Sequence, residues 1–360
     1  MFLLLLLFGF SLLFWNLASS FSGKIKFVIP AFFVSATLLG FFFREITFFS
    51  AVQTFFLIFT CIALSLYIIL DILLVCLKIL RRPLSLPKRK IAGKIILITS
   101  LITTTNFLIY GIPHNADYKI ETSKITLKQN SKPFTVAFFT DLHLDPLFKQ
   151  SKLERLAVHL DSLQPDYIFF GGDLADITDS LLNEKGIDKL MQTVTSKAKK
   201  GTFAILGNHE AYMESVGSNP ANWMRHVGMI PLIDSTICTE HFCLTGRQDF
   251  HVARKKNTER TPLNNLVPNN SSLPWLLLDH QPHGIEKDYQ GKKPLLALSG
   301  HTHNGQFFPG TLLIDLIWPL SYGFGNLDGV NWLVSSGIDS WGPPVRVGSD
   351  TELWYLQFSP

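Results

Sequence analysis

Residues 293–303, KPLLALSGHTH, form the stretch that decides how the larger part of the chain folds. The apolar run PLLAL is typical of a buried strand. It ends at a glycine, and His301 and His303 follow at alternate positions. A turn that contains two histidines by chance would account for this pattern, and so would a metal site at the carboxyl end of a strand. The choice depends on whether partner ligands follow other strands.

Four other apolar runs end in residues of the same kind. They are FTVAFFT (134–140), PDYIFFGGD (165–173), TFAILGNHE (202–210) and LLLDHQPH (276–283). The candidate residues at the five strand ends are Asp141, His143, Asp173, Asp176, Asn208, His209, His280, His301 and His303. Carboxylate, imidazole and amide groups suit a hard or borderline divalent cation. Each run alone would be read as a strand end or a turn, but together they predict a metal site.

The segments between these strands have helical patterns. KLERLAVHLDSL (152–163) spaces its apolar residues as a helix does, and further helical stretches are expected near 180–197 and 220–227. Strands that alternate with helices indicate a layered α/β domain. Residues 250–275, which are rich in Asn, Lys, Arg and Pro, are expected to form a surface insertion.

The first 115 residues differ in composition, since Phe, Leu, Ile and Val dominate them. We expect a transmembrane region over 1–115, a linker over 116–132 and the α/β domain over 133–360. The expected membrane spans lie near 2–19, 27–43, 48–80 and 95–112. The first lacks the basic region and cleavage site of a signal peptide, so we expect it to be retained. A soluble amphipathic helix is the alternative for the fourth, because several threonines and Asn106 dilute it.

Charge is also distributed unevenly along the chain. Residues 1–115 hold 10 Lys or Arg and 2 acids, whereas the rest holds 22 and 26, so no nucleic-acid partner is expected. The loop 81–94 is rich in lysine and arginine and should be cytoplasmic. Four spans then place both termini and the α/β domain outside the cytoplasm. Lys119, Lys124 and Lys128 argue against this orientation, and without the fourth span the domain would be cytoplasmic.

Cys238 and Cys243 give an independent indication of the compartment. They lie in STICTEHFCLTG (235–246), which predicts two short strands joined by a turn. In an oxidising compartment they could form a cross-strand disulfide, whereas in a reducing one they would remain thiols. The sequence leaves both states open.

The five motifs, taken in order, resemble those of the calcineurin-like metallophosphoesterases. That family's pattern is D-x-H, G-D-x-x-D, G-N-H-(D/E), a lone H, and G-H-x-H. The resemblance covers about 133–360 and implies a layered α/β/β/α sandwich. The tail LVSSGIDSWGPPVRVGSDTELWYLQF (333–358) is similar to the end of a branch that contains membrane-anchored bacterial phosphoesterases. Asn304-Gly305 stands where that branch more often has Gly-Gly.

The resemblance implies a role for each motif residue. One divalent metal ion would be bound by Asp141, His143 and His303, and a second by Asn208, His280 and His301. Asp173 would bridge the two ions. His209 would assist the phosphoryl oxygen or the leaving group, and Asp176 would orient a ligand. The ions would be manganese, iron or zinc, and the implied reaction is in-line attack on phosphorus by a metal-bound hydroxide.

These roles imply a metal-dependent phosphoric ester hydrolase embedded in the cell membrane. We expect a multi-pass protein of a bacterial inner membrane, with an extracytoplasmic domain that hydrolyses a phosphodiester or related ester of an envelope or lipid-linked substrate. The alternative is a cytoplasmic-face pyrophosphatase that acts on a nucleotide-activated lipid precursor. A binding or scaffolding protein that lost catalysis is a third possibility. It is disfavoured because all eight metal-binding and outer histidine positions are filled.

Overall fold

The computed structural model describes residues 2–43, 46–269, 272–287 and 289–360. It divides into two compact units, residues 1–111 and residues 112–360. The first unit is helical, and the second is built on two β-sheets.

The helical unit is formed by α1 (Phe2–Ser20), α2 (Ile25–Phe42), α3 (Thr47–Ile79) and most of α4 (Leu86–Ala116). Among the described residues, α3 and α4 are long and apolar enough to cross a membrane, and Ile25–Leu39 is a shorter apolar helix. The structure thus provides two candidate spans at the positions expected for the third and fourth. Spans at α1 and α2 stay predictions.

Side chains from all four helices contribute to the core of the helical unit. Leu13 and Leu17 of α1 pack with Phe59 of α3, and Phe33 of α2 and Leu97 of α4 lie against this cluster.

Two polar features of the helical unit bear on the sequence predictions. Asp71 accepts a hydrogen bond from Asn16 Nδ2 at 3.2 Å, so this acid faces a neighbouring helix, where it costs less than in contact with lipid. The segment 81–94 is only partly a loop, because α4 begins at Leu86. Pro87 in the first turn explains this start, since proline lacks the N–H that an early helical residue leaves unpaired.

Only two residues separate α4 from the first strand, β1 (Lys119–Thr126). This strand lies inside the segment 116–132, which was expected to be a linker. It pairs in parallel with the C-terminal strand β12 (Glu352–Ser359). Its side chains alternate between exposed and half-buried, so it has too few core residues for its sequence to indicate a strand.

The first sheet has six strands in the order β1-β12-β2-β3-β4-β5. Its other members are β2 (Phe134–Phe139), β3 (Tyr167–Phe170), β4 (Gly201–Ala204) and β5 (Met229–Pro231). β2 to β5 run parallel, and β12 runs antiparallel to β2. The carboxyl ends of β2, β3 and β4 therefore meet at one edge, where three of the motifs begin.

The second sheet has six strands in the order β10-β11-β9-β8-β7-β6. They are β6 (Ser235–Cys238), β7 (Cys243–Gly246), β8 (Trp275–Leu278), β9 (Leu296–Ser299), β10 (Gly323–Leu327) and β11 (Val330–Val334). β6 and β7 form the expected hairpin, and β7, β8, β9 and β11 run parallel. The motifs that contain His280 and His301 follow β8 and β9.

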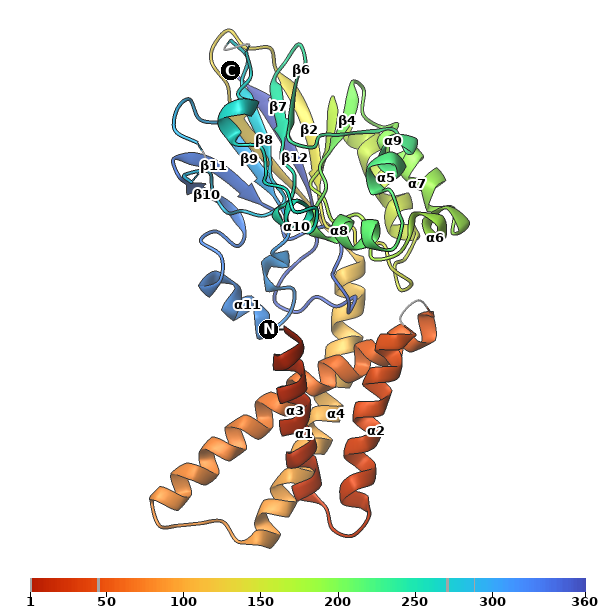
Figure 1. Cartoon of the computed structure of the whole chain (residues 1–360), viewed down its shortest axis with the longest axis vertical. Helices are drawn as coiled ribbons and strands as arrows, with labels where there is room; N and C mark the ends of the chain where they lie inside the picture. Colours follow the sequence, from red (N-terminus) through yellow and green to blue (C-terminus); the bar gives the residue numbers. More distant parts are fainter. Residues whose placement is uncertain (1, 44–45, 270–271, 288) are drawn as a thin grey trace. The chain divides into compact units, whose positions relative to one another are not determined.

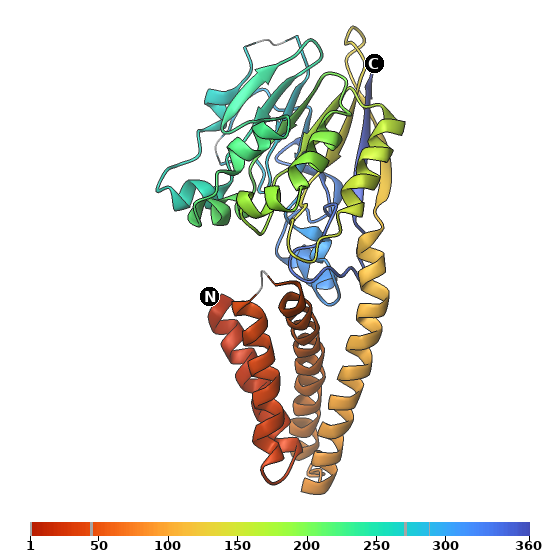
Figure 2. The ribbon, with the colours of Figure 1, turned by 90° about the vertical axis from the view of Figure 1, so that its right-hand side faces the viewer.

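The two sheets pack face to face, and helices cover the first sheet (Figures 1 and 2). Phe138 points into the core between the sheets, and Phe139 points into the core beneath α5 (Ser151–Leu163) and α7 (Ile187–Thr195). Successive strand residues face opposite sides, and both sides of β2 are covered, so all of its residues except the half-buried Thr135 are apolar and buried. α9 (Pro220–His226) extends the same helical layer.

The outer face of the second sheet departs from the expected helical layer. It is covered by the short 3₁₀ helix η1 (Leu263–Leu266) and by loop residues such as Ile285 and Leu320. The expected surface insertion 250–275 contributes to this cover. Val252 and Leu263 are fully buried. The segment 250–275 therefore has an apolar inner side, which its mostly polar composition does not indicate.

The remaining short helices are α6 (Asp179–Glu184), α8 (Asn208–Ser215), α10 (Phe250–Lys255), η2 (His303–Gly305), α11 (Gly310–Leu313) and η3 (Ile314–Leu316). Two of them begin at motif residues: α8 at Asn208 and η2 at His303. The stretches near 180–197 and 220–227 contain α6, α7 and α9, as expected.

Candidate metal centre

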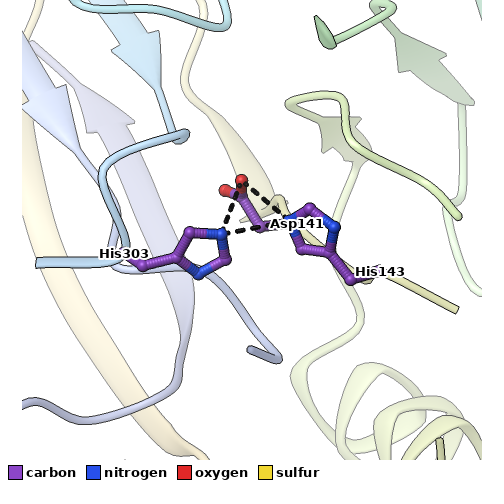
Figure 3. Close-up of side chains that lie close together, drawn as sticks. All are labelled: Asp141, His143 and His303. Atoms are coloured by element: carbon purple, nitrogen blue, oxygen red, sulfur yellow. Dashed lines mark hydrogen bonds and ion pairs between the residues drawn. The ribbon is translucent and has the colours of Figure 1, made fainter. Parts of the chain in front are cut away.

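The first group of motif residues consists of Asp141, His143 and His303 (Figure 3). His143 Nε2 and His303 Nε2 are 3.0 Å apart, and they lie 3.8 Å and 3.5 Å from Asp141 Oδ1. All three residues are buried. Two ring nitrogens and a carboxylate oxygen thus face one point, although β2 and β9 supply them from distant parts of the sequence.

The second group consists of Asp173, His280 and His301. His280 Nε2 lies 3.1 Å from Asp173 Oδ2, and the rings of His280 and His301 are 5.1 Å apart. The other ring nitrogen of His280, Nδ1, lies 2.8 Å from the carbonyl oxygen of Gly171, to which it can donate. This bond fixes the ring so that Nε2 faces the carboxylate.

Asp173 is shared between groups. Besides His280, it lies near His143, whose Nε2 is 3.7 Å from Asp173 Oδ2. The backbone N–H of His209 donates to Asp173 Oδ1 at 2.8 Å. A carboxylate in this position can contact ions on both sides.

The donors fit a pair of divalent cations. Among the described residues, buried Asn208 Oδ1 and His280 Nε2 have no hydrogen-bond partner. Buried polar atoms are rarely left unpaired, so the Asn208 oxygen, and the His280 nitrogen whose near neighbour is the Asp173 carboxylate at 3.1 Å, fit a site that binds a further ligand. Imidazole nitrogen with carboxylate and amide oxygen is a set that zinc, iron and manganese accept.

His209 and Asp176 lie beside these groups. His209 Nδ1 contacts Asp176 Oδ1, and the same oxygen lies 3.3 Å from His143 Nδ1. One carboxylate therefore orients two rings, and it leaves the Nε2 atoms of both free to face the cluster. His209 is less buried than His143, so its ring is the more accessible of the two.

The charges of the cluster are strongly coupled. Burial opposes ionisation of His280, but attraction to Asp173 outweighs it and raises the pKa to about 10. Burial and the neighbouring His280 charge lower the pKa of His301 to about 4. Burial opposes ionisation of Asp176 as well, yet attraction to His143 and His209 lowers the pKa of this carboxyl.

The backbone of the site is unusual for residues other than glycine. Positive φ angles occur at Asp141 (57°), His143 (43°), Asp173 (55°), His301 (71°) and His303 (50°). This left-handed region is sterically unfavourable for side chains with a Cβ atom. The backbone therefore turns sharply at these five ligand candidates.

Two glycines permit close approach of the backbone to the carboxylates. A Cβ atom at Gly207 would lie 2.2 Å from Asp173 Oδ1, and one at Gly300 would lie 2.1 Å from Asp141 Oδ2. Only glycine fits at these two positions, which explains the glycine in the G-N-H and G-H-x-H motifs.

Glu210 is a site residue to which sequence reasoning gave no role. Its buried carboxylate accepts from the backbone N–H groups of Gly207 at 2.5 Å, Leu174 at 2.6 Å and Asp173 at 3.1 Å. It thus ties the second motif to the third. Its place as the last residue of the GNHE motif (207–210) is the feature of the sequence that could have indicated a role in the site.

Arg346 is a second residue that the sequence did not single out. It is fully buried, and its Nη1 donates to the carbonyl oxygen of His303 at 2.7 Å. It also donates to Ser336 O and Asp339 O, both at 2.6 Å. The segment PPVRVG (343–348) gave no indication that this arginine is buried.

The arrangement defines a class: a two-sheet α/β protein with a buried histidine and aspartate cluster suited to divalent metals. Residues 134–305 match the family model described as calcineurin-like phosphoesterase. An uncharacterized metallophosphoesterase of Aquifex aeolicus is 30% identical over 256 residues, which cover 68% of this chain and 94% of that protein. The chain therefore belongs to the calcineurin-like metallophosphoesterases.

Other relatives are longer than the matched region. An uncharacterized metallophosphoesterase of Helicobacter pylori is 30% identical over 244 residues, 67% of this chain and 64% of that protein. A Danio rerio protein described as a transmembrane protein with metallophosphoesterase domain is 28% identical over 280 residues, 71% of this chain and 61% of its own length. The match thus spans less than two thirds of these two relatives.

Proposed function

We propose that the protein is a membrane-anchored phosphoesterase with two divalent metal ions. The observation that supports this most strongly is the shared position of Asp173 between Asp141, His143 and His303 on one side and His280 and His301 on the other. Asn208, with its unpartnered Oδ1, completes the second set. These seven residues are the proposed ligands.

Two bound divalent ions would lower the pKa of water and neutralise charge on the phosphoryl oxygens. The protein's part is to hold the donors in place. Asp176 and the carbonyl of Gly171 fix the rings of His143 and His280, and Arg346 fixes His303. Donors fixed in this way need little rearrangement when a substrate binds.

His209 is the proposed proton donor or phosphoryl contact. Its Nδ1 is held by Asp176, and Nε2 lies 3.9 Å from Asp173 Oδ2 at the less buried side of the cluster. Burial opposes the charged ring, but attraction to Asp173 raises its pKa above the ordinary value. A protonated ring in this position could transfer a proton to a departing oxygen.

We propose an extracytoplasmic site and a phosphodiester or related ester of an envelope or lipid-linked compound as substrate. The Cys238–Cys243 disulfide, which joins opposite residues of β6 and β7, supports an oxidising compartment. The candidate spans α3 and α4 support anchoring in a membrane. Lys119, Lys124 and Lys128 are the observation that favours the alternative, a pyrophosphatase of the cytoplasmic face.

The activity is tested with the full chain purified in detergent. After chelation and dialysis, hydrolysis of bis-p-nitrophenyl phosphate should return when manganese, iron or zinc is added. Asp173→Asn should remain at background, whereas Asp161→Asn on the surface of α5 should behave as wild type. Absence of metal-dependent turnover above the Asp173→Asn background would contradict the enzyme proposal.

The side of the membrane is tested with alkaline phosphatase and green fluorescent protein fused separately after Pro360. Phosphatase activity without fluorescence would support the extracytoplasmic site, and mass spectrometry after alkylation should then find Cys238 and Cys243 unmodified. Fluorescence without phosphatase activity would overturn the location and favour the cytoplasmic-face pyrophosphatase.

A further inference from the structure

A short segment after the last motif exposes large apolar side chains. Leu316 is 82% exposed, Ile317 70%, Leu312 66%, Phe308 55% and Leu313 51%. We call these five residues the apolar ridge. They lie on and beside α11 and η3, and within the described chain no other stretch as short in the second unit exposes so many. A contiguous apolar patch usually marks a surface that another body covers.

The apolar ridge is joined directly to the candidate metal centre. The ring of Trp318, which follows Ile317, lies 5.1 Å from the ring of His301 and 4.7 Å from that of His283. At the other end, the N–H of Phe308 donates to Val347 O at 3.0 Å. The ridge therefore forms part of the rim around the metal ligands.

The last turn of α4 is held at the same rim. Within the second unit, Asn115 Nδ2 donates to Asp339 Oδ1, and Ser340 Oγ donates to Asn115 Oδ1, both at 2.7 Å. The N–H of Asp339 in turn donates to Asp141 O at 3.1 Å. Two hydrogen bonds thus connect the end of an apolar helix to a proposed metal ligand.

One loop carries both contacts. The loop of residues 335–349 contacts Asn115 through Asp339 and Ser340. It also contacts Phe308, the first residue of the apolar ridge, through Val347. Arg346 of the same loop donates to His303 O and, through Nε, to Ser340 Oγ at 3.0 Å. The loop of residues 335–349 therefore contacts the end of α4, the proposed ligand His303 and the apolar ridge.

The charge of the segment favours a lipid over a protein surface. Residues 307–323 contain one charged residue, Asp315, whose carboxylate accepts from Ser321 Oγ. Protein interfaces usually combine apolar contacts with a rim of polar and charged side chains. A segment of leucine, isoleucine, phenylalanine and tryptophan in a chain with candidate membrane helices matches the side chains that enter the interfacial region of bilayers.

We propose that the apolar ridge enters the lipid bilayer into which α4 runs, so that the metal centre opens onto lipid headgroups. This inference rests on the proposed membrane location. It specifies the substrate class as a phosphate ester whose apolar part stays in the bilayer while its phosphate reaches the metal centre.

The test uses the full chain in nanodiscs of phosphatidylethanolamine and phosphatidylglycerol. Cys61 and Cys76 are replaced by alanine, and Leu316→Cys is labelled with an environment-sensitive nitrobenzoxadiazole dye. Asn130→Cys is the control. It is exposed in the turn before β2, at the opposite end of that strand from the metal ligands. The dye at 316 should be blue-shifted and quenched at least threefold by lipids with doxyl groups on their acyl chains, whereas the dye at 130 should not.

Two results would overturn the proposal. One is a dye at 316 as exposed to water as the dye at 130. The other is a blue-shifted dye that lipid-borne quenchers do not reach, which would show that a protein surface covers the ridge. Leu312→Asp with Ile317→Asp should abolish quenching at 316, and circular dichroism checks that this variant folds. Metal-dependent hydrolysis of a soluble diester by the labelled chain reports separately on the proposed function.

Discussion

The guanidinium of Arg346 holds His303 at two points: Nη1 donates to the carbonyl oxygen at 2.7 Å, and Nη2 lies 3.0 Å from ring Nδ1. The ring is thereby turned so that Nε2 faces Asp141 and His143. Within the part of the chain that the structure describes, Arg346 forms no ion pair with a carboxylate, and its guanidinium instead orients a proposed metal ligand.

Replacing Arg346 should weaken metal binding, because it releases the proposed ligand His303 while the other proposed ligands keep their contacts. Arg346→Met is expected to lower the affinity for one of the two ions by about 10- to 100-fold, as loss of a group that orients a ligand usually does. Arg346→Lys should recover part of it, since an ammonium can still donate to His303 O. Isothermal titration calorimetry with the metal ion measures the affinity, and Arg225→Met on the surface is the control. Equal affinities in Arg346→Met and wild type would contradict the prediction.

His209→Asn should separate chemistry from metal binding. Because His209 is proposed to act on the substrate, kcat should fall by roughly 10²- to 10⁴-fold. The metal content, measured by inductively coupled plasma mass spectrometry, should stay at two ions per chain. His226→Asn, at an exposed position of α9, is the control. Loss of one ion from His209→Asn would instead make this histidine a ligand, which its distance from Asp173 also permits.

Glu210→Gln should destabilise the metal-free protein. The carboxylate accepts from three backbone N–H groups, and an amide would turn a donor toward at least one of them. An unpaired buried N–H costs about 1–3 kcal/mol. Chemical unfolding of the chelated protein measures the difference, with Glu214→Gln in the same helix as control. Unchanged stability would show that the carboxylate is already neutral and replaceable, since burial and Asp173 raise its pKa to about 7.

Lys152 should make stability depend on pH in the alkaline range. Its Nζ donates to Asn115 O and Ile338 O and pairs with Asp339 at 3.2 Å, yet burial outweighs this pairing and lowers its pKa from 10.5 to about 8. Below pH 8 both folded and unfolded chains bind the proton. Between about 8 and 10.5 only the unfolded chain does, so the free energy of unfolding should rise with pH by up to about 1.4 kcal/mol per unit.

Lys152→Met isolates this effect. The variant should lack the additional rise between pH 8 and 10.5, whatever its stability at pH 7. Thermal unfolding of the second unit within the full chain, followed by near-ultraviolet circular dichroism across that range, measures the slope, with the exposed variant Lys199→Met as control. Parallel slopes in wild type and Lys152→Met would show that the ammonium keeps its proton in the folded protein.

The sequence alone was sufficient to predict a strand where the residues of that strand form a recognisable pattern. β2, β3, β8 and β9 are short apolar runs that end at glycine or a polar ligand, so both the strand and the position of its ligands could be predicted. Parallel pairing then brings the ends of β2 and β3 together at one edge of the first sheet and the ends of β8 and β9 at one edge of the second. The roles assigned to the individual ligands stay predictions, which the variants above address.

The sequence was insufficient where a residue depends on a distant partner. β1 is mostly polar, and its place in the sheet is provided by β12, more than 200 residues later. In the sequence, Arg346 has the features of an ordinary surface arginine. Its burial depends on the carbonyl oxygens of Ser336, Asp339 and His303, which accept its hydrogen bonds in the folded chain. The continuation of α4 through Lys88 and Lys90 is different, because Pro87 was a local signal for a helix start.

The positive φ angles at five proposed ligands bear on why these residues are kept. Each costs on the order of 1 kcal/mol relative to an ordinary conformation, and glycine or asparagine at the same positions would relieve part of that cost. The chain would thus gain stability by giving up these proposed ligands. Folding alone therefore gives no reason for Asp141, His143 and His303 to occupy these positions, whereas a functional site placed there at some expense of stability does.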